Sequence, residues 1–274
     1  MKVQLVTNEK IAETSSKGNQ EKWFDKEWGY WYKLDQFGYE ALSESLISAI
    51  LEKSNIKTCT PFTFVSYTPV RLKVHGRERT GCRSKNFLEK GKSIITLNRL
   101  LSQHLGMPLK DKLLSLSSDK KRTEYLAHAT KEYTGLDCFG EYLTLLFEID
   151  SLFLNDDRHL NNIAVIKDVE KYEYCPIFDN GAGLLSNVQM SPMDIAPQAL
   201  MSALKARPFI TSFTRQMNTA RSMFGKQLSL PALKKEDISN ILYPLLDFYP
   251  ERDRAIISDR VIKCIMTRQK LFRL

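Results

Sequence analysis

The chain has 274 residues, of which 43% are hydrophobic, so it is long enough for one large domain or two packed lobes. Its 40 Lys and Arg against 32 Asp and Glu give a net charge of +8, which favours an anionic partner without distinguishing nucleic acid, membrane or nucleotide. The five cysteines are scattered and none forms a C-x-x-C pair, which argues against a zinc site or a disulfide framework and favours a reducing compartment.

Two features of the sequence bear on location. The start of the chain turns polar after a short apolar run and carries Glu9 and Glu13, unlike a cleaved secretion signal. The most apolar stretch, residues 142–154, contains Glu148 and Asp150 and falls short of the roughly 20 apolar residues that a spanning helix needs. We therefore expect a cytoplasmic protein without a membrane segment.

The first 88 residues have the pattern of strands and turns around one helix. Residues 28–34 and 61–74 are rich in aromatic and β-branched side chains, which is typical of strands. Between them, residues 40–53 carry apolar side chains at helical spacing after the break at Gly38, which predicts an amphipathic helix. This order predicts a small β-rich lobe over residues 1–88.

From about Ile94 onward the pattern becomes helical. Residues 118–134 form a predicted helix that ends at Gly135, and the apolar side chains of residues 139–153 recur every three or four positions. Residues 89–274 are therefore expected to form a larger, mainly helical lobe. The predicted fold class is α+β, with two lobes and no long linker between them.

The sharpest functional signal is a polar cluster where the second of these helices ends. In residues 155–162 an Asp precedes an Asn by five positions, and residues 178–183 then place Asp179 in a turn with two glycines. Phosphoryl transfer from ATP needs this set: a carboxylate to orient the attacking hydroxyl, and Asn and Asp oxygens to hold Mg²⁺ against the phosphates. The cluster therefore indicates a kinase-like site.

Two alternatives stay open on spacing alone. Asp156 precedes Asn161, and Asp157 precedes Asn162, by the same five positions, so the register is ambiguous. A turn rich in Asn and Asp that only caps helices has the same composition.

The segment Asp157-Arg158-His159-x-x-Asn162 resembles the D-R-H-x-x-N loop of phosphatidylinositol kinases and of the HipA-like and CtkA-like bacterial serine/threonine kinases. The resemblance implies a bilobal, protein-kinase-like fold that uses ATP and Mg²⁺. It selects Asp157 as the catalytic base, Asn162 and Asp179 as the metal ligands, and His159 as a residue that supports the loop.

The same resemblance implies an ATP site in the first lobe. Lys33, the single lysine of the strand at residues 28–34, is expected to contact the α- and β-phosphates, and Glu40 on the next helix is expected to pair with it; Glu44, one turn later, competes for that pairing. Between residues 83 and 88 we expect a hinge whose backbone at Asn86 and Leu88 binds adenine. A loop resembling the phosphate-covering segment of these kinases is formed by Ser16, Lys17, Gly18, Asn19 and Gln20.

The sequence departs from the better-known eukaryotic protein kinases. It contains no G-x-G-x-x-G, and its metal-binding turn reads Asp-Asn-Gly where those kinases have Asp-Phe-Gly. The atypical branch is therefore favoured, with a Ser or Thr hydroxyl of a protein as acceptor and self-phosphorylation at Ser15 or Ser16. The alternatives are a small-molecule or lipid kinase with the same site, or a catalytically silent pseudokinase that binds protein or nucleic acid.

Basic residues gather in two segments. Residues 71–92 hold eight Lys or Arg against two Glu, and residues 195–235 hold seven with no acidic residue. A solvated positive face is the plain interpretation, and a nucleic-acid surface is the functional one. By the same resemblance, an antitoxin-like partner is a further expectation.

Overall fold

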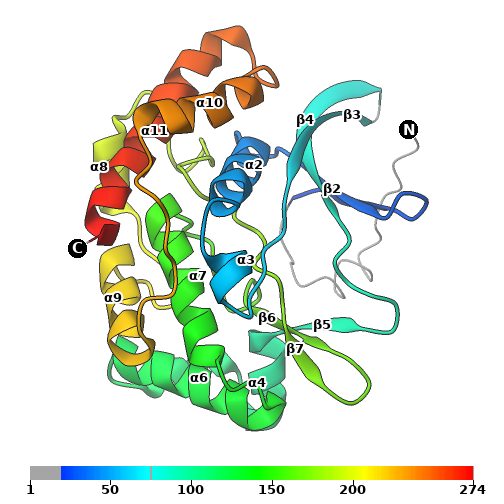
Figure 1. The fold of residues 1–274 in the computed structure, drawn as a ribbon, viewed down its shortest axis with the longest axis vertical. Coiled ribbons are helices and arrows are strands. Elements are labelled where there is room, and N and C mark those ends of the chain that lie inside the picture. The colour runs from blue at the N-terminus through cyan, green and yellow to red at the C-terminus, as the bar shows by residue number, and fades with distance from the viewer. Residues whose placement is uncertain (1–19, 75, 274) are drawn as a thin grey trace.

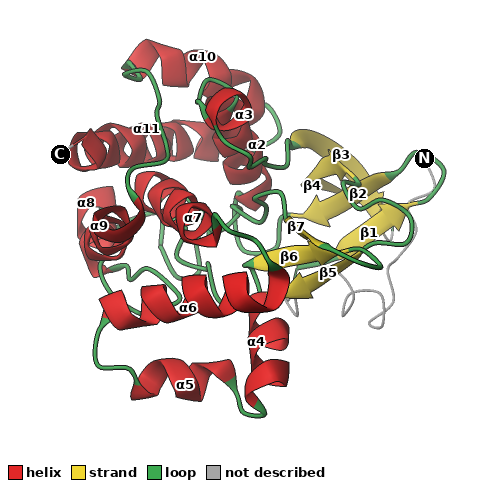
Figure 2. Cartoon of the chain, turned by 60° about the horizontal axis from the view of Figure 1, so that its bottom comes forward, coloured by secondary structure: helices red, strands yellow, loops and turns green. Residues whose placement is uncertain are grey.

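The computed structural model describes residues 20–74 and 76–273, which form two lobes (Figure 1). Strands gather on one side of the molecule and most helices on the other (Figure 2). This arrangement confirms the predicted α+β class. Within the described residues, no helix has the length and apolar character needed to cross a membrane.

The first sheet is antiparallel, and its strands follow the order β1 (Lys22–Asp25), β2 (Tyr30–Leu34), β4 (Arg77–Lys85) and β3 (Thr68–Val74). Because side chains alternate across a strand, Tyr32 and Leu34 are buried on one face while Lys33 lies on the other. Lys33 is paired with Cys82 of β4, which packs against Ala41 of the following helix. The alternation therefore turns Lys33 toward that helix.

Helix α2 (Glu40–Leu51) confirms the helix predicted for residues 40–53. The short helix α3 (Ile56–Cys59) follows it. It is buried on nearly all sides, because it lies between the first sheet and the helical lobe (Figure 1). The chain enters it at Gly38, where a Cβ atom would overlap the carbonyl oxygen of Ser186. Glycine therefore permits the close approach of the two lobes at the start of α2.

The predicted strand over residues 61–74 is only half a strand. Residues 68–74 form β3, whereas Val65 donates its N–H to Ile177 O at 2.9 Å and Ile177 donates to Thr63 O at 2.8 Å. This short parallel pairing ties the first lobe to the segment that leads into Asp179. The difference arises because residues 63–65 pair with Ile177 of the second lobe and not with β4.

The helical lobe contains α4 (Leu97–Leu105), α5 (Leu109–Ser115), α6 (Asp119–Thr134), α7 (Phe139–Phe153), α8 (Pro197–Ala203), α9 (Phe213–Phe224), α10 (Lys235–Leu246) and α11 (Glu251–Arg273). Helix α6 begins and ends where the sequence predicts: Ser118 Oγ accepts from Lys121 N, and Gly135 closes the helix in the left-handed region. Helix α7 is buried along its whole length against α6, α9 and α11. It forms the central support of the lobe.

A second antiparallel sheet, β5 (Ser93–Thr96), β6 (Ala164–Lys167) and β7 (Tyr172–Tyr174), flanks this lobe. The expectation that helices take over from Ile94 is wrong at this point, because β5 comes first. A four-residue strand that runs directly into α4 is too short to show a period of two in sequence.

Candidate active site

Lys33 lies at the centre of a buried charge cluster. Its Nζ donates to Glu44 Oε1 at 2.7 Å and to Asp179 Oδ1 at 2.6 Å. The second oxygen of Glu44 accepts from the backbone N–H of Asn180 at 2.9 Å. Glu44 thus holds both the lysine of the first lobe and the turn that follows Asp179.

The expected ion pair between Lys33 and Glu40 is wrong. Glu40 turns back on the chain, where its two carboxylate oxygens accept from Phe37 N at 2.7 Å and Gly38 N at 3.1 Å. The reason is position: Glu40 is the first residue of α2, whereas Glu44, one turn further, reaches Lys33. Glu40 therefore fixes the loop before α2, and Glu44 makes the ion pair.

Arg158 ties the site together beneath the surface. Fully buried, it pairs with Asp150 of α7 at 3.1 Å and donates to Phe178 O at 2.7 Å and to Asn180 Oδ1 at 2.6 Å. It also donates to Asn162 O at 3.2 Å. One guanidinium therefore joins α7, the loop at residues 155–162 and the turn at residues 178–183.

The loop at residues 155–162 folds tightly after α7. His159 N donates to Asp157 O at 2.7 Å, and Asn162 Nδ2 donates to the same oxygen at 3.0 Å. The Asp157 side chain stays 51% exposed, and His159 Nε2 lies 3.9 Å from its carboxylate. Asp157 is thus held by its backbone while its carboxylate stays accessible.

Asn162 is buried, yet its Oδ1 has no hydrogen-bond partner among the described residues. Buried polar atoms are nearly always bonded, so this oxygen is a candidate to bind a ligand or metal ion. It lines a cleft of about 300 Å³ together with Asp157, Asp179, Gln20 and Lys22. The cleft therefore combines carboxylate and amide oxygens with nearby positive charge.

Their electrostatic surroundings shift the pKa values of Asp157 and Asp179 in opposite directions. Burial alone would favour the neutral form of Asp179, but the charges of Lys33 and Lys22 hold its pKa below the ordinary value. Partial burial raises the pKa of Asp157; His159 opposes that shift and the charge of Asp179 adds to it. Burial would also lower the pKa of Lys33, but Asp179 and Glu44 outweigh it and raise that pKa. Asp179 therefore stays anionic, while Asp157 is the more basic carboxylate.

The predicted hinge lies between two small apolar clusters. Phe87 and Phe178 contact both clusters, with ring centroids 6.3 Å apart, and Leu88 belongs to one of them. Two backbone groups expected to bind adenine have partners within the protein: Asn86 N donates to Gly29 O at 2.8 Å, and Leu88 N donates to the Asn86 side chain at 3.3 Å. Adenine binding at these two residues stays a prediction.

The predicted phosphate-covering loop is described only at its end. Residues 16–19 lie outside the described residues, and Gln20 donates its Nε2 to Leu34 O at 2.7 Å. That bond anchors the end of the segment to β2, and Gln20 lines the cleft.

The basic segment at residues 71–92 is partly neutralised by acidic neighbours. Arg71 pairs with Glu78 at 2.8 Å, Arg79 with Glu21 at 3.2 Å and Lys92 with Glu173 at 2.8 Å. These ion pairs reduce the positive charge available to a phosphate backbone. The nucleic-acid surface stays a prediction.

We compared the chain with protein-family models, curated proteins and solved structures. No protein-family model matches the sequence, and no curated protein matches it. Among solved structures, the proinflammatory kinase CtkA of Helicobacter pylori superposes with a TM-score of 0.63 over 93% of this chain and 88% of that one, at 14% identity. The chain has a kinase-like fold. A second similar structure, HipA of the Shewanella oneidensis MR-1 toxin–antitoxin system in complex with HipB and operator DNA, gives a TM-score of 0.47 at 13% identity, covering 98% of this chain and 72% of that one.

The resemblance inferred from the D-R-H-x-x-N segment is therefore confirmed at the level of the fold. Asp157, Asn162 and Asp179 line one cleft, and Lys33 is ion-paired with Asp179. The catalytic, nucleotide-binding and metal-binding roles of these residues stay predictions. Sequence reasoning missed the role of Arg158. The signal was present, because Asp150 sits in an otherwise apolar helix, and a buried acid needs a cation.

Proposed function

We propose that this protein is an ATP- and Mg²⁺-dependent serine/threonine protein kinase of the HipA-like and CtkA-like type. One observation carries the proposal: Asp179 lines the same cleft as Asp157 and Asn162, and its ion-pair partner Lys33 is held in turn by Glu44. A binding module has no need for this combination, whereas phosphoryl transfer needs every member of it. The kinase-like fold supports the same conclusion.

The donor set suits Mg²⁺. Two hard oxygen ligands are present: the Oδ1 of Asn162, which has no partner among residues 20–74 and 76–273, and the carboxylate of Asp179, kept anionic by its low pKa. The described residues hold no cluster of three or more His, Cys, Asp or Glu side chains that would cage a metal. Mg²⁺ in kinases needs no such cage, because phosphates and water complete its coordination. When bound, the ion would neutralise charge on the phosphates.

Residues other than those that line the cleft also suit a nucleoside triphosphate. Lys33 is positioned by Glu44 to donate to phosphate oxygens, as the lysine of a kinase strand does. Phe87, Leu88 and Phe178 offer apolar surface where the two lobes meet, which favours a flat aromatic base. Phosphates and base would thus lie in separate polar and apolar parts of the interlobe region.

In the proposed reaction Asp157 orients the acceptor hydroxyl and accepts its proton. The hydroxyl oxygen bonds to the γ-phosphorus while the bond from that phosphorus to the leaving ADP oxygen breaks. The raised pKa of Asp157 makes its carboxylate a better proton acceptor than an ordinary Asp. His159 lies 3.9 Å away and helps to keep that carboxylate in place.

Several finer expectations remain part of the proposal. The acceptor is a Ser or Thr hydroxyl of a protein, and Ser15 or Ser16 is a candidate for self-phosphorylation. An antitoxin-like partner, a nucleic-acid partner and a cytoplasmic location remain predictions from the sequence.

The acceptor class is tested by incubating purified protein with γ-labelled ATP and Mg²⁺. Three acceptors run in parallel: the protein itself, a library of Ser/Thr peptides, and phosphoinositide vesicles. The proposal predicts label on Ser or Thr. Label confined to the vesicles would favour a lipid kinase, and ATP binding without transfer to any acceptor would favour a pseudokinase.

A further inference from the structure

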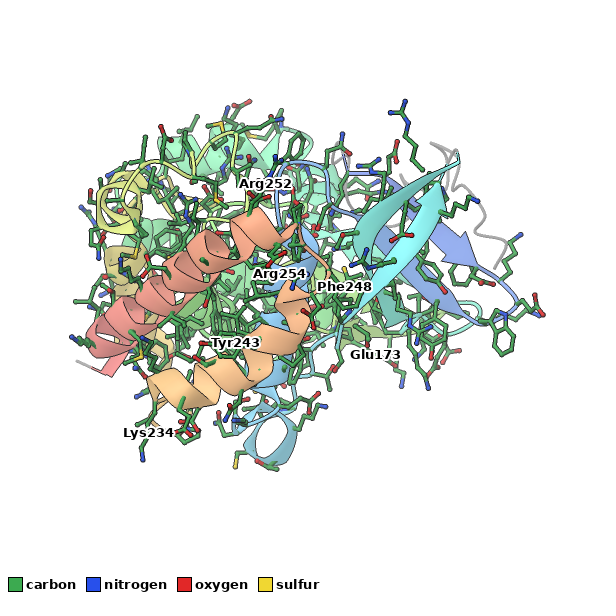
Figure 3. All side chains as sticks on the ribbon, turned by 90° about the horizontal axis from the view of Figure 1, so that it is seen from above. Glu173, Lys234, Tyr243, Phe248, Arg252 and Arg254 are labelled. Atoms are coloured by element: carbon green, nitrogen blue, oxygen red, sulfur yellow. The ribbon has the colours of Figure 1, made fainter. Side chains whose placement is uncertain are left out.

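The corner between the last two helices contacts the start of α2. Residues 247–250 join α10 to α11, and Figure 3 shows Phe248 beside the strands of the first sheet. The hydroxyl of Tyr249 accepts a hydrogen bond from Leu42 N at 3.1 Å, although the two residues are 207 positions apart in sequence. The last two helices thus reach into the first lobe.

Tyr249 and Asp35 together complete the first turn of α2. The Tyr249 hydroxyl donates to Asp35 Oδ2 at 2.7 Å, and Asp35 Oδ1 accepts from Ala41 N at 2.6 Å. The N-cap residue of α2 is Tyr39, whose side chain makes no capping bond. A helix leaves its first N–H groups without internal partners, so these two side chains supply what the cap does not.

Hydrogen bonds attach the corner that carries Tyr249 to the first sheet. Thr80 Oγ1 donates to Phe248 O at 2.8 Å, and Arg71 donates to Asp247 O at 2.7 Å. Arg254 Nε donates to the carbonyl of Tyr249 itself at 3.0 Å. Tyr249 as a whole residue is only 8% exposed. The hydroxyl therefore meets α2 from a fixed position.

The first turn of α2 sets the position of Glu44. Leu42 precedes Glu44 by two residues in one continuous helix, which rises about 1.5 Å per residue and moves as a unit over that length. A small shift or rotation at Leu42 therefore changes the contact of Glu44 with Lys33, now 2.7 Å. Misplacement by about 1 Å far from the chemistry can cost roughly 100-fold in rate.

We infer that Tyr249 is a positioning residue for phosphoryl transfer, acting through α2 to keep Glu44 against Lys33. The inference rests on the proposed function, and it adds a role for the helix pair α10–α11, which lies in the lobe that the sequence predicts only as mainly helical. The hydroxyl, and not the buried ring, carries that role.

The test uses Tyr249→Phe, which removes only the hydroxyl, and the control Tyr243→Phe, which removes a hydroxyl from an exposed position on α10 (Figure 3). Self-phosphorylation and ATP hydrolysis are measured in the full chain. Tyr249→Phe should lower kcat at least tenfold with a smaller change in the KM for ATP, and Tyr243→Phe should change neither.

A double variant separates positioning from plain structural support. If Tyr249 acts through Glu44, adding Tyr249→Phe to Glu44→Gln should lower kcat less than twofold further. A full tenfold loss in that background would overturn the inference, because the two losses would then be independent.

Amide hydrogen exchange gives a readout that needs no activity. Exchange at residues 41–44 should speed up at least tenfold in Tyr249→Phe and stay unchanged in Tyr243→Phe. Unchanged exchange in Tyr249→Phe would overturn the inference whatever the activity. Absence of transfer in the wild type, with faster exchange in Tyr249→Phe, would instead count against the proposed function and leave the Tyr249 contact established.

Discussion

Glu44 offers the most demanding prediction, because the chain provides its own matched control in Glu40. Both carboxylates lie in α2, one turn apart, and both accept two hydrogen bonds. Glu44→Gln keeps the shape of the side chain but replaces one acceptor oxygen by an NH₂ donor. Whichever way the amide turns, a donor then faces either Lys33 Nζ or Asn180 N.

The size of the effect follows from the bonds that are lost. A hydrogen bond to a charged group contributes about 1.5–3 kcal/mol, and about 1.4 kcal/mol corresponds to a tenfold change in rate. Removing one such bond from Glu44 should therefore slow phosphoryl transfer roughly 10- to 100-fold. Glu40→Gln weakens only the loop before α2, and we expect about 1 kcal/mol less stability and less than about a fivefold change in rate.

Initial rates of label transfer from ATP, measured at several ATP concentrations, check both variants. Urea unfolding in parallel shows whether each variant is folded under assay conditions. A larger loss of transfer in Glu40→Gln than in Glu44→Gln, with both proteins folded, would refute the reasoning. The ion pair with Lys33 would then not be the one that matters for turnover.

Further predictions concern the loop that carries Asp157. Arg158→Met leaves Asp150 buried without its cation and should lower the free energy of unfolding by about 3–5 kcal/mol; a loss below about 1 kcal/mol in urea unfolding would be inconsistent with the buried pair. Because transfer needs ionised Asp157 and its pKa is raised, the rate should fall as pH drops through a value above 3.8, and a pH–rate profile flat down to about pH 4 would contradict this. Arg207→Ala removes a positive charge 3.9 Å from the Asp157 carboxylate and should move that acid limb to higher pH, whereas a shift to lower pH would exclude the contact.

Much of the helical fold could be predicted because local signals agree with the tertiary structure. Helix α6 lies between Ser118 and Gly135, which cap its two ends, and α7 follows a clear apolar repeat. The break at Gly38 likewise predicts the start of α2. Where local signals are weak, tertiary pairing decides the structure: residues 63–65 pair with Ile177, and β5 pairs with β6.

The same distinction between local signals and tertiary contacts applies to the residues of the candidate site. The residue types and spacing of Asp157, Asn162 and Asp179 are local features, so the sequence could indicate them. The choice between Glu40 and Glu44 depends on the rotation of α2 about its axis, which the packing of the whole lobe determines. Local patterning therefore left both glutamates open.

Longer-range contacts were outside the reach of sequence reasoning. The contact of Tyr249 with α2 joins segments at the two ends of the chain. Nothing in the residues around either segment marks the other as its partner. The last ninety residues could consequently be described only as helical support.

The central claim is tested most directly by single-turnover transfer of labelled phosphate in the wild type, Asp157→Asn and Asp156→Asn. The neighbouring carboxylate is the control, because it lines the same cleft and spacing alone does not tell the two apart. The account predicts that Asp157→Asn loses roughly 100- to 10,000-fold in rate, the usual contribution of a general base, while Asp156→Asn loses only a few-fold. Equal rates in the wild type and a folded Asp157→Asn would contradict it.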